Sequence, residues 1–111
     1  MKYGEIWLVN FSPNVGAEIG KIRVAVIVSN DAVGVLPLKV VVPITEPLRK
    51  IQNWHLPLVP NKVNMLDKKS VADCFQVKSV SKDRFIRKIG ELNDDEIAAL
   101  KVKLVIVLDL I

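Results

Sequence analysis

The chain of 111 residues contains one cysteine and one histidine, Cys74 and His55. One cysteine cannot form an internal disulfide, which fits a reducing compartment, so we expect a cytoplasmic protein. One histidine excludes a two-histidine acid–base site within one subunit, and the two residues together supply too few ligands for a zinc site. A thiol dyad of Cys74 with His55 is conceivable, but a small buried core residue is the better interpretation of Cys74.

Long apolar runs and cofactor motifs are also lacking. The apolar run 104–108 ends at Asp109, well short of the ~20 residues of a membrane-spanning helix, and the amino terminus lacks a secretory signal pattern. No phosphate loop or dinucleotide fingerprint occurs, so neither a cofactor nor a metal is expected. The 16 basic residues against 12 acidic ones give a net charge of +4. This excess permits a polyanionic partner without requiring one.

The chain does contain a series of short β-type segments. Val, Ile and aromatic residues concentrate in six segments that are separated by Pro, Gly and Asn, and short strands at this spacing are typical of a barrel. The predicted strands are residues 5–11, 23–29, 38–45, 54–58, 71–78 and 85–89. We see no repeat or linker, and we expect one domain over residues 1–111.

The pattern changes to that of a helix near the carboxyl terminus. Asn93 and Glu96 are spaced as in a capping box, and acidic residues fill the first turn. Apolar residues then continue at helical spacing from Ile97 to Ile111. The β-branched stretch 102–107 is a competing strand signal. The sequence therefore predicts a mainly β fold that closes with one α-helix.

Residues 4–30 carry the most informative pattern, GEIWLVNFSPNVGAEIGKIRVAVIVSN. Two apolar strands flank a polar loop in which Gly16 and Gly20 allow sharp turns. The loop delivers Arg23 at the start of the second strand, and Glu18 lies within reach of an ion pair with it. This layout is typical of an active-site flap.

This segment resembles the signature of the MazF/PemK family of toxin ribonucleases, in which a GDIWLVDF-like strand precedes a proline, a G-x-E-x-G loop, an R-P strand and a closing asparagine. The chain departs from it at Val24, where the family usually has proline. Later segments resemble the family more weakly: residues 41–45, residues 70–80 with Lys78 in place of arginine, residues 83–85 and the closing helix. The matching positions of the signature are Gly4, Ile6, Trp7, Pro13, Gly16, Glu18, Gly20, Arg23 and Asn30.

The resemblance implies a small SH3-like barrel with a C-terminal helix, the PemK/CcdB-like fold. It also implies a homodimer, sequence-selective cleavage of single-stranded RNA, and inhibition by a cognate antitoxin, which we expect to be acidic and partly disordered. By motif position, Arg23 and Thr45 correspond to the residues that carry catalysis in the MazF branch. Another branch uses a different set, whose positions hold Ala17, Asp73 and Phe75 here, so that set is absent.

The chemistry of RNA cleavage fits these residues. Metal-free cleavage uses the neighbouring 2′-hydroxyl as nucleophile, so the protein must remove its proton and stabilise charge on the phosphate. Arg23 offers a planar fork of donors for two phosphate oxygens, and Thr45 offers a hydroxyl. Arginine is a poor proton acceptor, so the base stays open, with Glu18 as a candidate. Alternatively, Arg23 only pairs with Glu18 at a strand start, and Thr45 is an ordinary strand-end residue.

Further residues are candidates for binding RNA, and other functions stay open. Solvated loop lysines and arginines, among them Lys68 and Lys69, could track phosphates. One alternative is a toxin of the same fold that poisons a topoisomerase by binding it. Another is a catalytically weak relative that binds RNA or a protein, which Val24 makes possible because proline would stiffen the approach to Arg23. The predicted RNA-binding residues are Lys21, Arg49, Lys50, Gln76 and Lys78.

Overall fold

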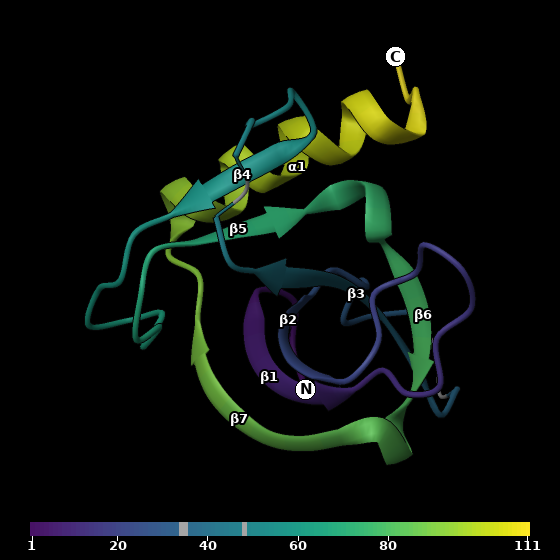
Figure 1. The fold of residues 1–111 in the computed structure, drawn as a ribbon. Helices are drawn as coiled ribbons and strands as arrows, with labels where there is room; N and C mark the ends of the chain where they lie inside the picture. Colours follow the sequence, from purple (N-terminus) through teal and green to yellow (C-terminus); the bar gives the residue numbers. More distant parts are fainter. Residues whose placement is uncertain (34–35, 48) are drawn as a thin grey trace.

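The computed structural model describes residues 1–33, 36–47 and 49–111, in which seven antiparallel strands curl around a core and one helix lies over one end (Figure 1). The strand order is β4-β5-β3-β2-β1-β7, and β6 pairs with β3 beside this path. Among these residues no pairing joins β7 back to β4 or β6, so the curled sheet stays open. The elements are β1 (Glu5–Asn10), β2 (Ile22–Ile27), β3 (Leu38–Thr45), β4 (His55–Leu58), β5 (Ser70–Asp73), η1 (Cys74–Gln76), β6 (Lys78–Ser81), η2 (Lys82–Arg84), β7 (Phe85–Glu91) and α1 (Asp94–Leu108).

The predicted mainly β fold with a C-terminal helix is confirmed, but the single strand expected over residues 71–78 is wrong. The Asp73 side chain accepts a hydrogen bond from the Phe75 amide at 3.1 Å and starts the short helix η1. This side chain competes with strand pairing for the backbone. As a result, β5 pairs with the end of β3 and β6 pairs with its beginning.

Helix α1 begins where the sequence predicts. The Asn93 side chain accepts from the Glu96 amide at 2.8 Å, and the Glu96 carboxylate accepts from the Asn93 amide at 2.9 Å. Because this capping box satisfies otherwise unpaired amides, the helix starts at Asp94 and continues through the β-branched stretch that had favoured a strand. The described residues contain no helix that is long and apolar enough to cross a membrane.

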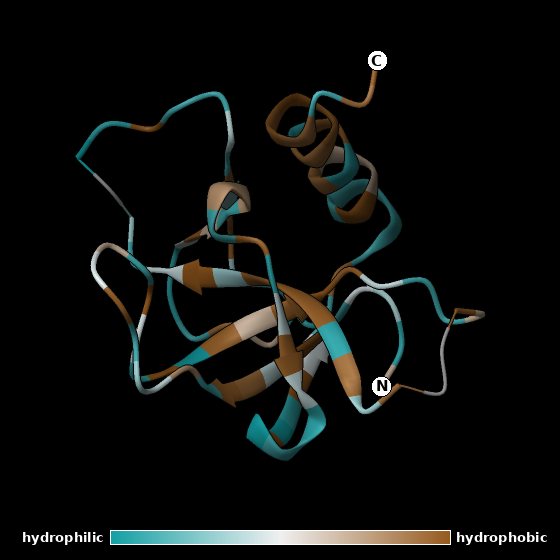
Figure 2. Cartoon of the chain, turned by 90° about the vertical axis from the view of Figure 1, so that its right-hand side faces the viewer, coloured by the Kyte–Doolittle hydropathy of each residue, from teal (hydrophilic) through white to brown (hydrophobic). Residues whose placement is uncertain are grey.

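The main core lies between the sheet and α1. Leu100 is fully buried there, in one cluster with Leu56 and Leu58 of β4 and with Ile6 and Val26 of the neighbouring strands. Figure 2 shows that the second half of α1 consists largely of hydrophobic residues. The exposed apolar residues of this half, and of the chain just after it, are Val102, Ile106, Leu108, Leu110 and Ile111.

The segment between β4 and β5 is held by one buried amide side chain. The Asn64 Oδ1 atom accepts from the amides of Asn61 and Leu66, each at 3.0 Å, and its Nδ2 atom donates to the Val59 carbonyl at 2.9 Å and to Glu96 at 3.1 Å. These bonds fix an irregular segment that forms no strand of its own, and the Val63 carbonyl also accepts from the Glu91 amide at the end of β7 at 3.0 Å. Residues 65–68, which follow Asn64 in this segment, form one wall of the groove described next.

Candidate active site

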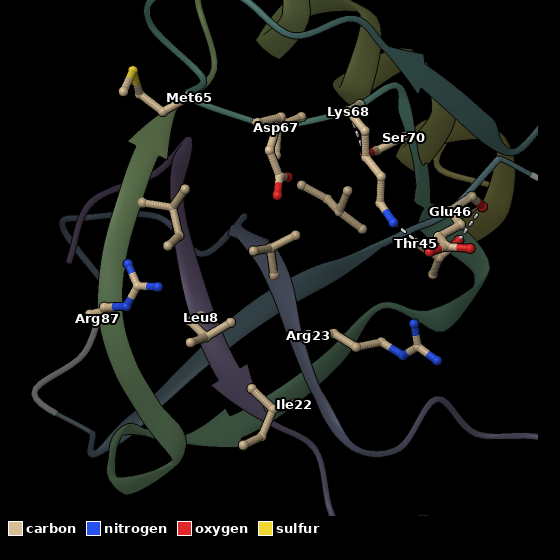
Figure 3. A pocket seen from close by; sticks show the side chains of 14 residues that line it. Leu8, Ile22, Arg23, Thr45, Glu46, Met65, Asp67, Lys68, Ser70 and Arg87 are labelled. Carbon is tan, nitrogen blue, oxygen red and sulfur yellow. Dashed lines mark hydrogen bonds and ion pairs between the residues drawn. The ribbon is translucent and has the colours of Figure 1, made fainter.

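A groove of about 440 Å³ opens between the curled strands and the segment that precedes β5 (Figure 3). Its volume is typical of sites that hold a small ligand or one unit of a polymer. Figure 3 shows the apolar side chains of Leu8 and Ile22 between Arg87 on one side and Arg23 on the other. The lining residues are Leu8, Ile22, Arg23, Val24, Ile44, Thr45, Glu46, Met65, Leu66, Asp67, Lys68, Ser70, Arg87 and Ile89.

Strand register brings Arg23 and Thr45 together at one end of this groove. Ala25 of β2 lies opposite Pro43 of β3 in an antiparallel pair, and Arg23 and Thr45, each two residues from this pair, both line the groove. Both also line an adjoining depression, together with Glu46 and Pro47. Residues that are 22 positions apart in the sequence are therefore neighbours.

Arg23 keeps guanidinium donors for a ligand, whereas the one donor of Thr45 is used within the chain. The half-buried Arg23 donates from Nε to the Gly20 carbonyl at 3.3 Å, and none of the ion pairs among the described residues involves it. The Thr45 hydroxyl donates to the carbonyl of Glu46 at 3.0 Å. A guanidinium and a hydroxyl at one end of a groove form an arrangement that suits a phosphate.

An ion pair between Glu46 and Lys68 lies at the same end. The Lys68 ammonium donates a hydrogen bond to the Glu46 carboxylate. This bond and the charge of Lys68, with a smaller effect from Arg23, hold the pKa of Glu46 below its usual value. Glu46 in turn raises the pKa of Lys68. Figure 3 shows the pair across the groove from the Arg23 side chain.

The flap loop, which is the polar loop between β1 and β2, is attached to the last residue of η1 and to the first residue of β6. Gln76 accepts from the Ile19 amide and donates to the Ala17 carbonyl, both at 3.2 Å, and Lys78 pairs with Glu18 at 3.3 Å. The expected ion pair of Glu18 with Arg23 is therefore wrong. Strand β6 pairs with β3 and carries Lys78 to the loop, which draws the Glu18 carboxylate toward that lysine.

The other predicted RNA-binding residues lie outside the groove lining. Lys21 has a left-handed backbone, φ 66°, and its amide donates to the Ser12 hydroxyl at 3.0 Å. Arg49 and Lys50 are exposed in the segment between β3 and β4. Their part in RNA binding stays a prediction, as does that of Gln76 and Lys78, which hold the loop in the structure.

Sequence reasoning missed Glu46, Asp67 and Arg87 as groove residues. Glu46 could have been found because it directly follows Thr45 at the strand end. Arg87 lies opposite Leu8 in the pairing of β7 with β1, and Asp67 lies in an irregular segment. Neither of these two placements has a local sequence signal.

Cys74 and His55 do not form a reactive dyad. Cys74 is fully buried, and burial raises the pKa of its thiol to about 12. His55 is also buried, and its Nδ1 atom accepts from the Gln52 amide at 2.8 Å. The prediction of Cys74 as a core residue is confirmed. In the part of the chain that the structure describes, no cluster of three or more potential metal ligands occurs.

Comparison with known proteins decides the family. Residues 2–108 match the family described as the PemK-like, MazF-like toxin of type II toxin–antitoxin systems. The chain belongs to this family. It is 32% identical over 117 residues to endoribonuclease MazF9 of Mycobacterium tuberculosis, covering 99% of this chain and 98% of that protein. It is 33% identical over 96 residues to endoribonuclease MazF of Staphylococcus saprophyticus, covering 85% and 79%.

Solved structures show the same fold. The crystal structure of MazF from Deinococcus radiodurans superposes with a TM-score of 0.83 at 24% identity, covering 98% of this chain and 96% of that one. An endoribonuclease in complex with its cognate antitoxin from a mycobacterial species gives a TM-score of 0.79 at 18% identity, covering 100% and 97%. The PemK/MazF-like fold expected from the sequence is confirmed.

Proposed function

We propose that this MazF/PemK-family protein is the toxin of a type II toxin–antitoxin system and cleaves single-stranded RNA as a metal-independent, sequence-selective endoribonuclease. The observation that carries the proposal is that Arg23 and Thr45 line the same end of one groove and the depression beside it. Two relatives of similar length are named endoribonucleases. This supports RNA as the substrate, so we expect the protein to act in the cytoplasm.

In the proposed reaction, the 2′-hydroxyl of the substrate attacks the adjacent phosphorus. Arg23 bridges two phosphate oxygens with its planar fork, and this contact strengthens as negative charge grows in the transition state. The Thr45 hydroxyl turns from the Glu46 carbonyl and donates to a phosphate oxygen. Val24 of β2 occupies the position of the usual proline and lies opposite Leu8 of β1. The pairing of these two strands therefore holds the backbone next to Arg23, as the proline ring would do otherwise.

The flanking RNA would follow basic residues outside the groove. Lys21, Arg49 and Lys50 are exposed, and such side chains attract phosphates without reading bases. Gln76 and Lys78 position the flap loop, and we propose that the shape of this loop helps to select the bases.

We also propose that the protein is a homodimer. Helix α1 exposes Val102 and Ile106, and Leu110 and Ile111 extend this apolar surface beyond the helix. A second copy that covers these side chains would remove apolar surface from water. A monomeric mass near 12.4 kDa in light scattering at micromolar concentration would contradict the dimer.

A cognate antitoxin is the other expected partner. One neighbour in the fold comparison is a complex with its cognate antitoxin, and another is a MazE–MazF complex from Deinococcus radiodurans. The net charge of +4 favours an acidic segment, and an extended, partly disordered chain could cover the flap loop and pair with strand edges. Co-expression with the acidic protein encoded beside it should relieve toxicity and yield a stable complex. Persistent toxicity without a complex would contradict this partner.

The activity is tested by incubating the purified protein with a mixed RNA in EDTA and mapping the new 5′ ends. We expect cuts that share a short sequence. Intact RNA in both EDTA and magnesium would refute the endoribonuclease and favour a binder with the same fold. Cleavage that requires magnesium would refute the proposed site.

A further inference from the structure

The proposed reaction needs a proton acceptor that neither Arg23 nor Thr45 provides. Arginine stays protonated at any working pH, and a hydroxyl is a weak base. Among the described residues that line the groove, the carboxylates are those of Glu46 and Asp67. Of these two, only Glu46 also lines the depression of about 470 Å³ that it shares with Arg23 and Thr45.

We propose that Glu46 is the general base of this enzyme and that Lys68 positions its carboxylate; this inference rests on the endoribonuclease activity proposed above. Glu46 follows Thr45 directly, and its carboxylate is exposed rather than enclosed by protein. The hydrogen bond from Lys68 fixes one carboxylate oxygen, which leaves the other oxygen available to a substrate hydroxyl. Figure 3 shows this carboxylate beside Thr45, at the end of the groove to which Arg23 contributes.

In the proposed cleavage step, the 2′-hydroxyl gives its proton to the free carboxylate oxygen of Glu46 while the bond from O2′ to phosphorus forms. The bond from phosphorus to O5′ breaks, and the leaving O5′ takes a proton from a water molecule. The hydroxide left by that water accepts the proton held by Glu46. The products are a 2′,3′-cyclic phosphate and a 5′-hydroxyl, and Glu46 returns to its carboxylate form.

The groups around Glu46 set the pH range in which it accepts a proton. Lys68 faces it from the segment before β5, and Arg23 acts on it from β2. Asp67 lies next to Lys68 and lines the same groove. The two cations lower the pKa of Glu46, so its carboxylate is ionised at neutral pH and ready to accept a proton.

Glu18, the base considered from the sequence, is placed differently. Its carboxylate pairs with Lys78 of β6, and Glu18 is not among the residues that line the groove. A Glu18→Gln variant therefore separates the two assignments. It should change substrate binding through the flap loop and keep the pH dependence of the cleavage step.

The deciding experiment compares single-turnover cleavage by the wild type, Glu46→Gln and the matched control Glu91→Gln from pH 3 to pH 8. Glu91 is also an exposed glutamate paired with a lysine, at 3.4 Å, but it lies outside the groove lining. General-base catalysis contributes about 10²- to 10⁴-fold. We expect Glu46→Gln to lose about that factor and the rise of rate with pH, with unchanged RNA affinity, while Glu91→Gln matches the wild type.

Two further measurements separate a base from a structural partner. Formate should partly restore cleavage by Glu46→Ala, because a small carboxylate can occupy the vacated space. Lys68→Met should keep the rise of rate with pH but move it to higher pH, since Lys68 no longer lowers the pKa of Glu46. If Glu46→Gln keeps the wild-type rate and pH profile, or formate restores nothing, Glu46 is not the base. A wild type that cuts no RNA would instead refute the proposed function itself.

Discussion

Replacing Arg23 by lysine separates a geometric role of this residue from one of charge or stability. Within the described residues, Arg23 forms one hydrogen bond, from Nε to the Gly20 carbonyl at 3.3 Å, and no ion pair. Such a bond contributes about 0.5–1.5 kcal/mol net. Arg23→Lys should therefore lower the free energy of unfolding by about 1 kcal/mol, which corresponds to a few degrees in Tm for a domain of this size.

The effect on catalysis should be larger than the effect on folding. Lysine keeps the positive charge but cannot bridge two phosphate oxygens with a planar fork. We expect the single-turnover rate to fall about 10²-fold or more, or about 2.7 kcal/mol in activation free energy, while RNA affinity changes little. Rates, RNA affinity and Tm should be measured on the same preparations. A folded Arg23→Lys variant with near wild-type cleavage would remove Arg23 from the mechanism, and a loss confined to Tm would make it a structural residue.

Three other predictions follow from single contacts. Burial raises the pKa of Cys74 from its ordinary 9.0 to about 12. The stability that the protonated thiol contributes is therefore present below pH 9 and is lost as the pH rises from 9 through 12. Unfolding by urea at pH 8 and pH 10.5 should show this loss of stability in the wild type and a smaller loss in Cys74→Ala. Asn64→Asp replaces a buried donor by a carboxylate that faces Glu96 and should cost about 3 kcal/mol in chemical denaturation; a loss below about 1 kcal/mol would contradict the hydrogen bonds described for Asn64. Gln76→Ala removes both hydrogen bonds to the flap loop, so limited proteolysis within residues 14–21 should accelerate while Tm changes little. An unchanged rate of proteolysis would show that Gln76 does not hold the loop.

Local patterns in the sequence were sufficient for most elements of the fold. The capping box of Asn93 and Glu96 predicts the start of α1 because its bonds involve residues three apart. The break between β5 and β6 was missed because it depends on one local contact, from Asp73 to the Phe75 amide. That contact decides the break only because β3 offers two different segments for pairing.

The candidate site was predictable where a family motif carried it. Arg23 and Thr45 came from motif positions, and the pairing of β2 with β3 brings the strand ends that carry them to the same groove. The partner of Glu18 depends on where β6 lies, which no spacing within residues 4–30 encodes. The pairing of Glu46 with Lys68 joins residues 22 positions apart through a segment that is not part of any strand, so only the structure reveals it.

We propose above all that the protein cleaves RNA at the groove lined by Arg23 and Thr45, with the substrate's own 2′-hydroxyl as the nucleophile. The most direct test uses an RNA oligonucleotide that contains one mapped cut site and a copy with a single 2′-deoxy nucleotide on the 5′ side of that cut. Both are incubated with the wild type in EDTA, and the product ends are identified by mass spectrometry. We expect a 2′,3′-cyclic phosphate and a 5′-hydroxyl from the first oligonucleotide and no cut in the second. Cleavage of the 2′-deoxy copy at the same position and a similar rate would contradict this proposal.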